Sequence, residues 1–134
     1  MDRKYTFREK LGSGAFGTVY KAFDYSNNVF AIKVMDKNDP TARQELEALT
    51  RAQHNHIIKC FEAISMPTQV WLVLEFADVG TMTSAIRKRT CNTEEFNVWR
   101  TLWQMASALD YLHKLRPHIL HRLFYISSYL TIFD

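Results

Sequence analysis

Hydrophobic and polar residues alternate along the first third of the chain, as they do in half-buried strands. The runs at 5–11 ("YTFREKL"), 18–24 ("TVYKAFD") and 29–35 ("VFAIKVM") show this alternation, and the polar turn "YSNN" separates the last two. Strand-like runs return at 57–64 ("IIKCFEAI") and 70–76 ("VWLVLEF"). The pattern therefore predicts five strands in this part of the chain.

A helix is predicted between the third and fourth strands. Asp39 is a residue type that caps helix N-termini, and Pro40 suits the first helical position. The segment "TARQELEALTRA" that follows contains good helix formers. The expected order is three strands, one helix and two strands.

The pattern becomes helical after Gly80. "MTSAIRKR" predicts a short helix, and Asn92 with Glu95 forms a capping box for a long helix at 93–114. Six residues at three- and four-residue steps predict its buried face: Val98, Leu102, Met105, Ala106, Leu109 and Leu112. A second apolar stripe contains Phe96, Trp99 and Trp103. We expect this stripe to face water as a contiguous apolar patch, a site of protein-partner binding or of aggregation.

Length and composition limit the possible functions. A chain of 134 residues has room for one domain, and its net charge is only +3 with scattered basic residues. The basic cluster Arg87–Arg89 indicates a solvated helix end rather than a nucleic-acid site. No run of about 18 apolar residues is present, so no membrane span is expected.

Two further features indicate where the protein resides. The charged start, "MDRKYTFREK", lacks the apolar core of a signal peptide. Cys60 and Cys91 are isolated, which fits a reducing, intracellular compartment, and we expect a cytoplasmic protein.

Three glycines, Gly12, Gly14 and Gly17, form a G-x-G-x-x-G pattern in "GSGAFGTV". They join a strand to a strand, whereas in dinucleotide-binding folds such glycines join a strand to a helix. A glycine hairpin brings its backbone amides close to phosphates because no side chain intervenes. A flexible hairpin turn without a ligand is the alternative.

Lys33 lies inside an otherwise apolar strand, where an unpaired ammonium group is costly to bury. It therefore needs an anion. The candidates are a nucleotide phosphate and Glu45 on the following helix. In the alternative interpretation, Lys33 extends to solvent and Glu45 lies on an exposed helix face.

Taken together, these segments resemble the protein-kinase family. The run "LGSGAFGTVYKAF…FAIKVM…ELEALTRAQHNHIIKCFEAI…WLVLEFADVGTM…MASALDYLH…ILHR" matches kinase landmarks in order up to Arg122. "EEFNVWRTLWQMASALDYLHKLRPHILHR" is most similar to NIMA-related (Nek) serine/threonine kinases. The resemblance implies an α+β fold: a kinase-like small lobe of five antiparallel strands plus helix C, then an incomplete helical large lobe. Its expected parts are a small lobe at 1–76, a hinge at 77–80 and the truncated start of a large lobe at 81–134.

The resemblance also implies an ATP site. The implied residues are Leu11, Gly12, Gly14, Gly17, Val19, Ala31, Lys33, Glu45, Leu74, Glu75 and Ala77. The glycines would cover the phosphates, and Lys33 would hold the α- and β-phosphates while pairing with Glu45. Val19 and Ala31 would enclose the adenine. Leu74 would be the gatekeeper, backbone groups of Glu75 and Ala77 would bind the adenine edge, and Asp78 or Thr81 would lie near the ribose.

The sequence departs from the family pattern after Arg122. The positions of the catalytic Asp, the Lys and the magnesium-binding Asn carry Leu123, Tyr125 and Ser128, and no Asp-Phe-Gly follows. No catalytic residue is intact, and magnesium lacks its usual ligands. Glu45 follows Lys33 by only twelve positions, a shorter separation than kinases usually have.

The three histidines His113, His118 and His121 do not have the spacing of a zinc site, and no cysteine is near them, so we expect no metal site. By the resemblance, His121 would brace the catalytic loop.

Three functional hypotheses follow. The chain is an ATP-binding, catalytically impaired member of the kinase family, an active kinase whose reported end is wrong, or a non-enzymatic interaction fragment that holds no nucleotide.

Overall fold

A computed structural model describes residues 4–14, 17–77 and 98–116. They belong to two compact units. One unit comprises Met1–Arg51 and Lys59–Phe76, and the other comprises Ala52–Ile58 and Ala77–Asp134.

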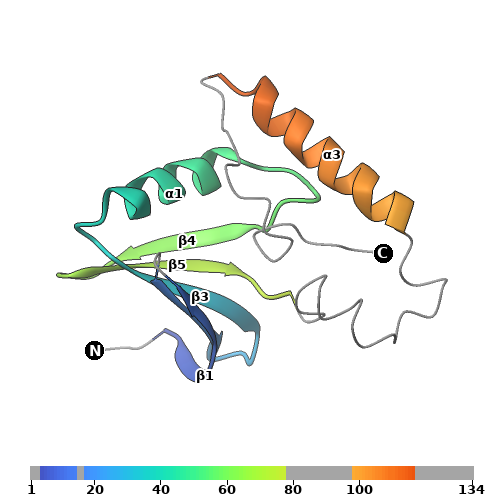
Figure 1. The fold of residues 1–134 in the computed structure, drawn as a ribbon. Coiled ribbons are helices and arrows are strands. Elements are labelled where there is room, and N and C mark those ends of the chain that lie inside the picture. The colour runs from blue at the N-terminus through green and yellow to red at the C-terminus, as the bar shows by residue number, and fades with distance from the viewer. Residues whose placement is uncertain (1–3, 15–16, 78–97, 117–134) are drawn as a thin grey trace. The chain divides into compact units, whose positions relative to one another are not determined.

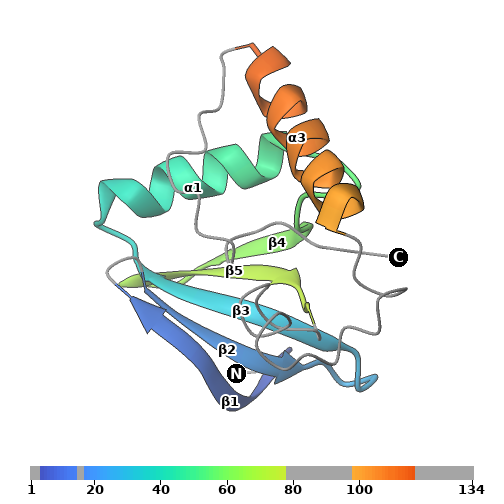
Figure 2. The same cartoon turned by 45° about the vertical axis from the view of Figure 1, so that its right-hand side comes forward.

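The first unit is a five-stranded antiparallel sheet with one helix, α1 (Pro40–Arg51) (Figure 1). The strands are β1 (Thr6–Gly14), β2 (Gly17–Phe23), β3 (Val29–Asp36), β4 (Cys60–Ser65) and β5 (Gln69–Glu75). Their spatial order is β1-β2-β3-β5-β4, and α1 lies along the β4 side of the sheet (Figures 1 and 2). The predicted order of three strands, one helix and two strands is confirmed.

Both faces of the sheet bury apolar side chains, because β3 and β5 are central strands whose residues alternate between the two faces. On the first face lies a cluster of Tyr5, Ala22, Ile32 and Val73 with five partly buried neighbours. The buried apolar residues of the second face are Ala31, Met35, Val70, Leu72 and Leu74. Because both of their faces are buried, β3 and β5 have nearly continuous apolar sequences.

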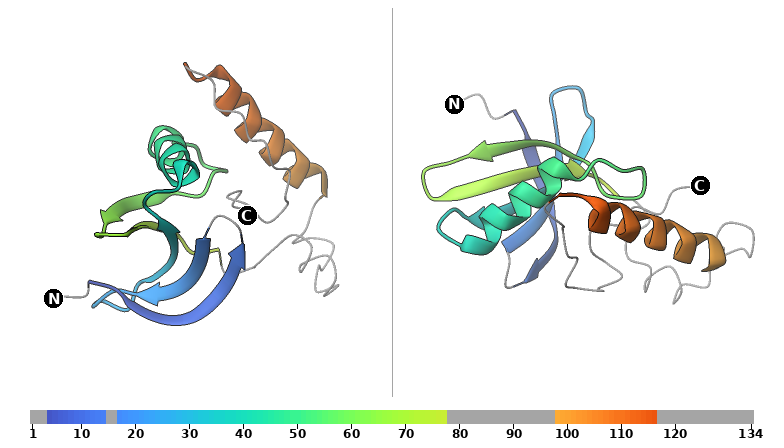
Figure 3. Two further views of the ribbon diagram at one scale, coloured as in Figure 1. Left: turned by 60° about the vertical axis from the view of Figure 1, so that its left-hand side comes forward. Right: turned by 90° about the horizontal axis from the view of Figure 1, so that it is seen from above.

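The two edge strands of the sheet are linked through side chains. Tyr5, directly before β1, donates a hydrogen bond to the carboxylate of Glu62 in β4, and Lys4 Nζ lies 2.6 Å from Glu62 Oε1. The hydrogen bond from Lys4, and then that from Tyr5, lower the pKa of Glu62. Strands at opposite edges meet in this way because the sheet curves strongly, as the left view of Figure 3 shows.

Helix α1 begins where the sequence predicts. Asp39 Oδ1 accepts a hydrogen bond from the Thr41 amide at 2.8 Å, and α1 starts at Pro40. This hydrogen bond from the Thr41 amide also lowers the pKa of Asp39. The N-cap is therefore a real contact.

Strand β4 is shorter than predicted. It begins at Cys60, whereas the apolar run suggested a strand from residue 57. Ile57 is buried in the second unit, against Ala108 and Leu112. Ile57 is apolar because it packs in that cluster and not in the sheet, so the predicted strand began three residues before the observed one.

In the second unit, helix α3 (Val98–Lys114) lies within the predicted long helix. It buries Leu112, as predicted, but its other buried positions differ from the predicted ones. The buried positions are Thr101, Gln104, Ala108 and Leu112. Leu102 is 47% exposed and Ala106 is exposed, so the prediction that both are buried is wrong. The physical reason is that the segment 52–58 packs along the stripe that contains the small Ala108, whereas the sequence pattern weighted only the larger apolar residues.

Trp99 and Trp103 are exposed, as expected. Phe96, the short helix at 82–89 and the capping box of Asn92 and Glu95 lie outside the described residues. Within the described ranges, no helix is long and apolar enough to cross a membrane.

Candidate functional site

The centre of the candidate site is a buried ion pair between β3 and α1. Lys33 Nζ donates to both carboxylate oxygens of Glu45, at 2.7 and 2.8 Å. The two side chains are only 10% and 13% exposed. A bidentate contact of this kind provides the anion that a buried ammonium group needs. The short spacing of twelve positions therefore does not prevent the pair from forming.

Strand register places three other candidate residues on the same face of the sheet as Lys33. Val19 lies directly opposite Lys33, and Ala31 lies directly opposite Leu74. Directly paired residues of antiparallel strands point to the same side, and Ala31 and Lys33 are two positions apart on β3. Val19, Ala31, Lys33 and Leu74 thus line one continuous, mostly apolar surface next to the ion pair.

The glycines of the β1–β2 hairpin have different structural roles. Gly17 has φ +120°, and a Cβ there would lie 2.3 Å from the carbonyl oxygen of Val34. Only glycine fits at this position. A Cβ on Gly12 or Gly14 would meet no atom within 4 Å. The described fold needs no glycine at these two positions, so their open space is suited to the close approach of a ligand.

The end of β5 is fixed by the start of β4. The Glu75 amide donates to the Lys59 carbonyl at 2.8 Å, and Glu75 Oε2 accepts from the Lys59 amide at 3.2 Å. Any contact of the Glu75 backbone with a ligand must therefore use its carbonyl group.

Two residues next to the ion pair were missed by the sequence reasoning. Leu72 is fully buried directly opposite Lys33, and Cys60 lies opposite Leu74. Burial raises the pKa of the Cys60 thiol, and the nearby Glu45 acts in the same direction. Leu72 could have been found from its two-residue spacing to Leu74, but the position of Cys60 depends on a bulge in β4.

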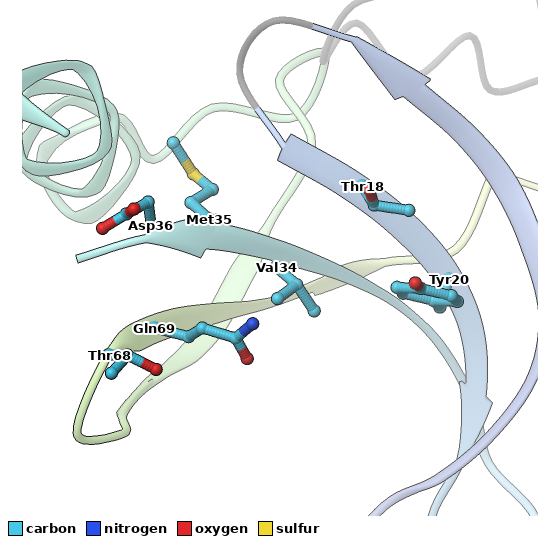
Figure 4. A pocket seen from close by; sticks show the side chains of 7 residues that line it. All are labelled: Thr18, Tyr20, Val34, Met35, Asp36, Thr68 and Gln69. Atoms are coloured by element: carbon cyan, nitrogen blue, oxygen red, sulfur yellow. The ribbon is translucent and has the colours of Figure 1, made fainter. Parts of the chain in front are cut away.

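A cavity of about 300 Å³ lies away from this surface (Figure 4). Three of its lining residues, Thr18, Tyr20 and Val34, alternate along β2 and β3 with Val19 and Lys33 and so project from the opposite face, and none of the candidate nucleotide-site residues lines it. The cavity is therefore not the candidate nucleotide site.

The other candidate residues are not among those that the strand register places beside Lys33. Leu11 is 45% exposed on β1, and Ala77 belongs to the second unit. Asp78, Thr81, His118, His121 and Leu123 lie outside the described residues. Among residues 4–14, 17–77 and 98–116, no group of three His, Cys, Asp or Glu side chains could hold a metal ion.

Comparison with known protein families identifies the fold. The family model described as protein kinase domain matches residues 5–123. The chain belongs to the protein kinase domain family. The resemblance inferred from the motifs is thereby confirmed at the family level, and the five-stranded sheet with α1 corresponds to the small lobe of a kinase domain, as predicted.

Relatives of this kinase domain include serine/threonine kinases. A probable serine/threonine-protein kinase of Dictyostelium discoideum is 34% identical over 126 residues, covering 89% of this chain and 25% of that protein. Serine/threonine-protein kinase srk1 of Schizosaccharomyces pombe is 34% identical over 128 residues, covering 83% of this chain and 22% of its own length. The Aurora kinase of the same yeast is 31% identical over 120 residues, covering 84% of this chain and 33% of its own length. The chain thus spans between about a fifth and a third of the length of these relatives.

Proposed function

We propose that this chain is an ATP-binding, catalytically impaired protein kinase domain of the serine/threonine type. The observation that carries the proposal is the bidentate pair of Lys33 and Glu45. In active kinases a lysine of the third strand pairs with a glutamate of the following helix and contacts the nucleotide phosphates. Lys33 would contact the α- and β-phosphates, and the open space at Gly12 and Gly14 would admit them.

Of the remaining roles, those of Val19, Ala31 and Leu74 are supported by the surface that these residues share with Lys33, and the others are carried over from the family resemblance. Val19 and Ala31 would enclose the adenine, Leu74 would be the gatekeeper, and the Glu75 carbonyl and the Ala77 backbone would bind the adenine edge. Gly17 would shape the hairpin, and Leu11 would border the adenine. We infer a small lobe at 1–76, a hinge at 77–80 and the start of a large lobe at 81–134; the division of the units after Phe76 supports this.

Catalysis is impaired in this proposal because of the residues that follow "HR". Leu123 cannot accept a proton, Tyr125 brings no positive charge, and Ser128 is a poor magnesium ligand. The loss of a positioned base costs a factor of about 10²–10⁴ in rate. A subtype close to the NIMA-related kinases remains a prediction from the segment "EEFNVWRTLWQMASALDYLHKLRPHILHR".

Thermal denaturation with ATP tests nucleotide binding. A ligand present at ~100 times its Kd stabilises the folded state by about 2.7 kcal/mol, so ATP should raise the Tm by several degrees. The rise should not depend on MgCl₂. Lys33→Met should abolish it, and the matched control Lys37→Met, which removes an exposed lysine just beyond β3, should leave it unchanged.

Phosphoryl transfer is tested separately. Incubation with radiolabelled ATP and serine/threonine peptides should give no transfer above background. Measurable transfer would disprove the impairment, and the absence of any Tm shift with adenine nucleotides would disprove nucleotide binding.

A second function is favoured by the exposed side of α3. Trp99 is 81% exposed and Trp103 is 65% exposed. Large exposed aromatic residues are enriched at protein interfaces. We propose protein binding through this side of the helix, independent of ATP.

A further inference from the structure

The segment 52–58 is held on α3 by a small apolar cluster. Ala52 and Ile57 pack with Ala108 and Leu112, and all four are buried. Tyr111 adds a polar contact, because its hydroxyl oxygen accepts a hydrogen bond from the Gln53 amide at 3.0 Å. This segment follows directly on α1, the helix that carries Glu45.

His54 lies in the middle of this contact. Its ring stacks obliquely on Tyr111, with 5.1 Å between the ring centroids, and its Nε2 lies 3.4 Å from Ser107 Oγ. The amide of His56 donates a hydrogen bond to His54 Nδ1 at 3.1 Å. A nitrogen that accepts a hydrogen bond carries no proton, so the proton of neutral His54 is on Nε2, facing Ser107.

The groups that face His54 do not compensate a positive charge. Burial lowers the pKa of His54, and the neighbouring His56, with its ring centroid 5.4 Å away, lowers it further. From α3, Ser107 and Tyr111 face it. Asp110 and Lys114 are paired with each other at 2.6 Å, and among the described residues no carboxylate pairs with His54.

We propose that His54 is a proton-sensitive clamp that holds the segment 52–58 on α3 in its neutral form and releases it when protonated. A second proton would bind at Nδ1, the atom that accepts from the His56 amide. Two donors would then face each other, and the hydrogen bond would be lost. The proposal does not depend on nucleotide binding.

The tautomer and the titration of His54 are tested by NMR on the full chain. Long-range ¹H–¹⁵N spectra should place the proton of neutral His54 on Nε2, and His54 should titrate below its ordinary value of 6.5. The amides of Gln53 and His56 should lose protection from hydrogen exchange as His54 becomes charged. A proton on Nδ1, or titration at or above 6.5, would overturn the proposal.

The effect on stability follows from the same titration. The unfolded chain binds the proton more readily than the folded chain, so stability is complete above pH 6.5 and is lost as the pH falls through the folded-state pKa. Between pH 7.5 and 5.5 the Tm of the wild type should fall about 3 °C more than that of His54→Asn, whose side-chain oxygen can accept from the His56 amide but does not titrate.

His113→Asn, which removes an exposed histidine of α3, should retain the wild-type decrease. An equal decrease in wild type and His54→Asn would contradict the clamp. If His54→Asn does not fold, the NMR titration of the wild type still decides.

Discussion

The two units of the chain hold a titratable side chain at a contact in opposite ways. In the strand unit, the ammonium group of Lys33 donates to both oxygens of the Glu45 carboxylate, so two opposite charges face each other. In the unit of 52–58 and α3, the imidazole of His54 is held in its neutral form by an amide donor and a hydroxyl group. The first contact therefore requires two charged groups, whereas the second requires that His54 carry no extra proton.

The largest effect should come from breaking the Lys33–Glu45 pair on one side. Glu45→Leu removes the bidentate carboxylate partner of a buried ammonium group and should lower the free energy of unfolding by ~3 kcal/mol, measured by urea denaturation. The double variant Lys33→Met/Glu45→Leu should recover most of this loss, because neither charge remains. A double variant as unstable as the two single variants combined would contradict the interpretation that the pair, and not the packing of each side chain, decides the cost.

A smaller effect is expected at the hairpin, where the strand unit contains a position that the fold itself restricts. Gly17→Ala should cost ~2 kcal/mol, because φ +120° disfavours a side chain and the new Cβ would contact the Val34 carbonyl oxygen. The matched variant Gly14→Ala should change unfolding by less than about 1 kcal/mol, since nothing lies within 4 Å of its Cβ.

The two glycine variants should differ in the opposite way in ATP binding: relative to the stability that each loses, Gly14→Ala should weaken ATP binding more than Gly17→Ala. Gly14→Ala should weaken the Tm rise with ATP although it changes the free energy of unfolding without ligand by less than about 1 kcal/mol. Equal stability losses in both glycine variants would show that the open space at Gly14 is not present in solution.

Much of the strand unit could be predicted from the sequence because its signals are local. Asp39 and Pro40 mark the start of α1, and alternation along β3 marks Lys33 as a buried charge that needs a partner. The distinction between Gly17 and the other glycines could not be predicted, because it depends on how close the Val34 carbonyl lies across the sheet.

The second unit was less predictable because its contacts join segments far apart in sequence. Ile57 read as a strand residue, yet it packs on Ala108, about fifty positions later. The periodicity of a helix sequence does not reveal which of its sides a short connection such as 52–58 will pack against. His54 could not be singled out for the same reason, since its role comes from Ser107 and Tyr111 on α3.

The smallest effect on stability is expected at Trp99, and a tryptophan in each unit makes the comparison. Trp71 in the sheet packs on Phe7 with 5.0 Å between the ring centroids, whereas Trp99 is 81% exposed on α3. Trp71→Ala should lower the free energy of unfolding by about 2–3 kcal/mol, and Trp99→Ala should change it by less than about 0.5 kcal/mol. Urea denaturation measures both. If Trp99→Ala proves as costly as Trp71→Ala, its ring is buried in solution, and the exposed side of α3 cannot be a surface kept open for a protein partner.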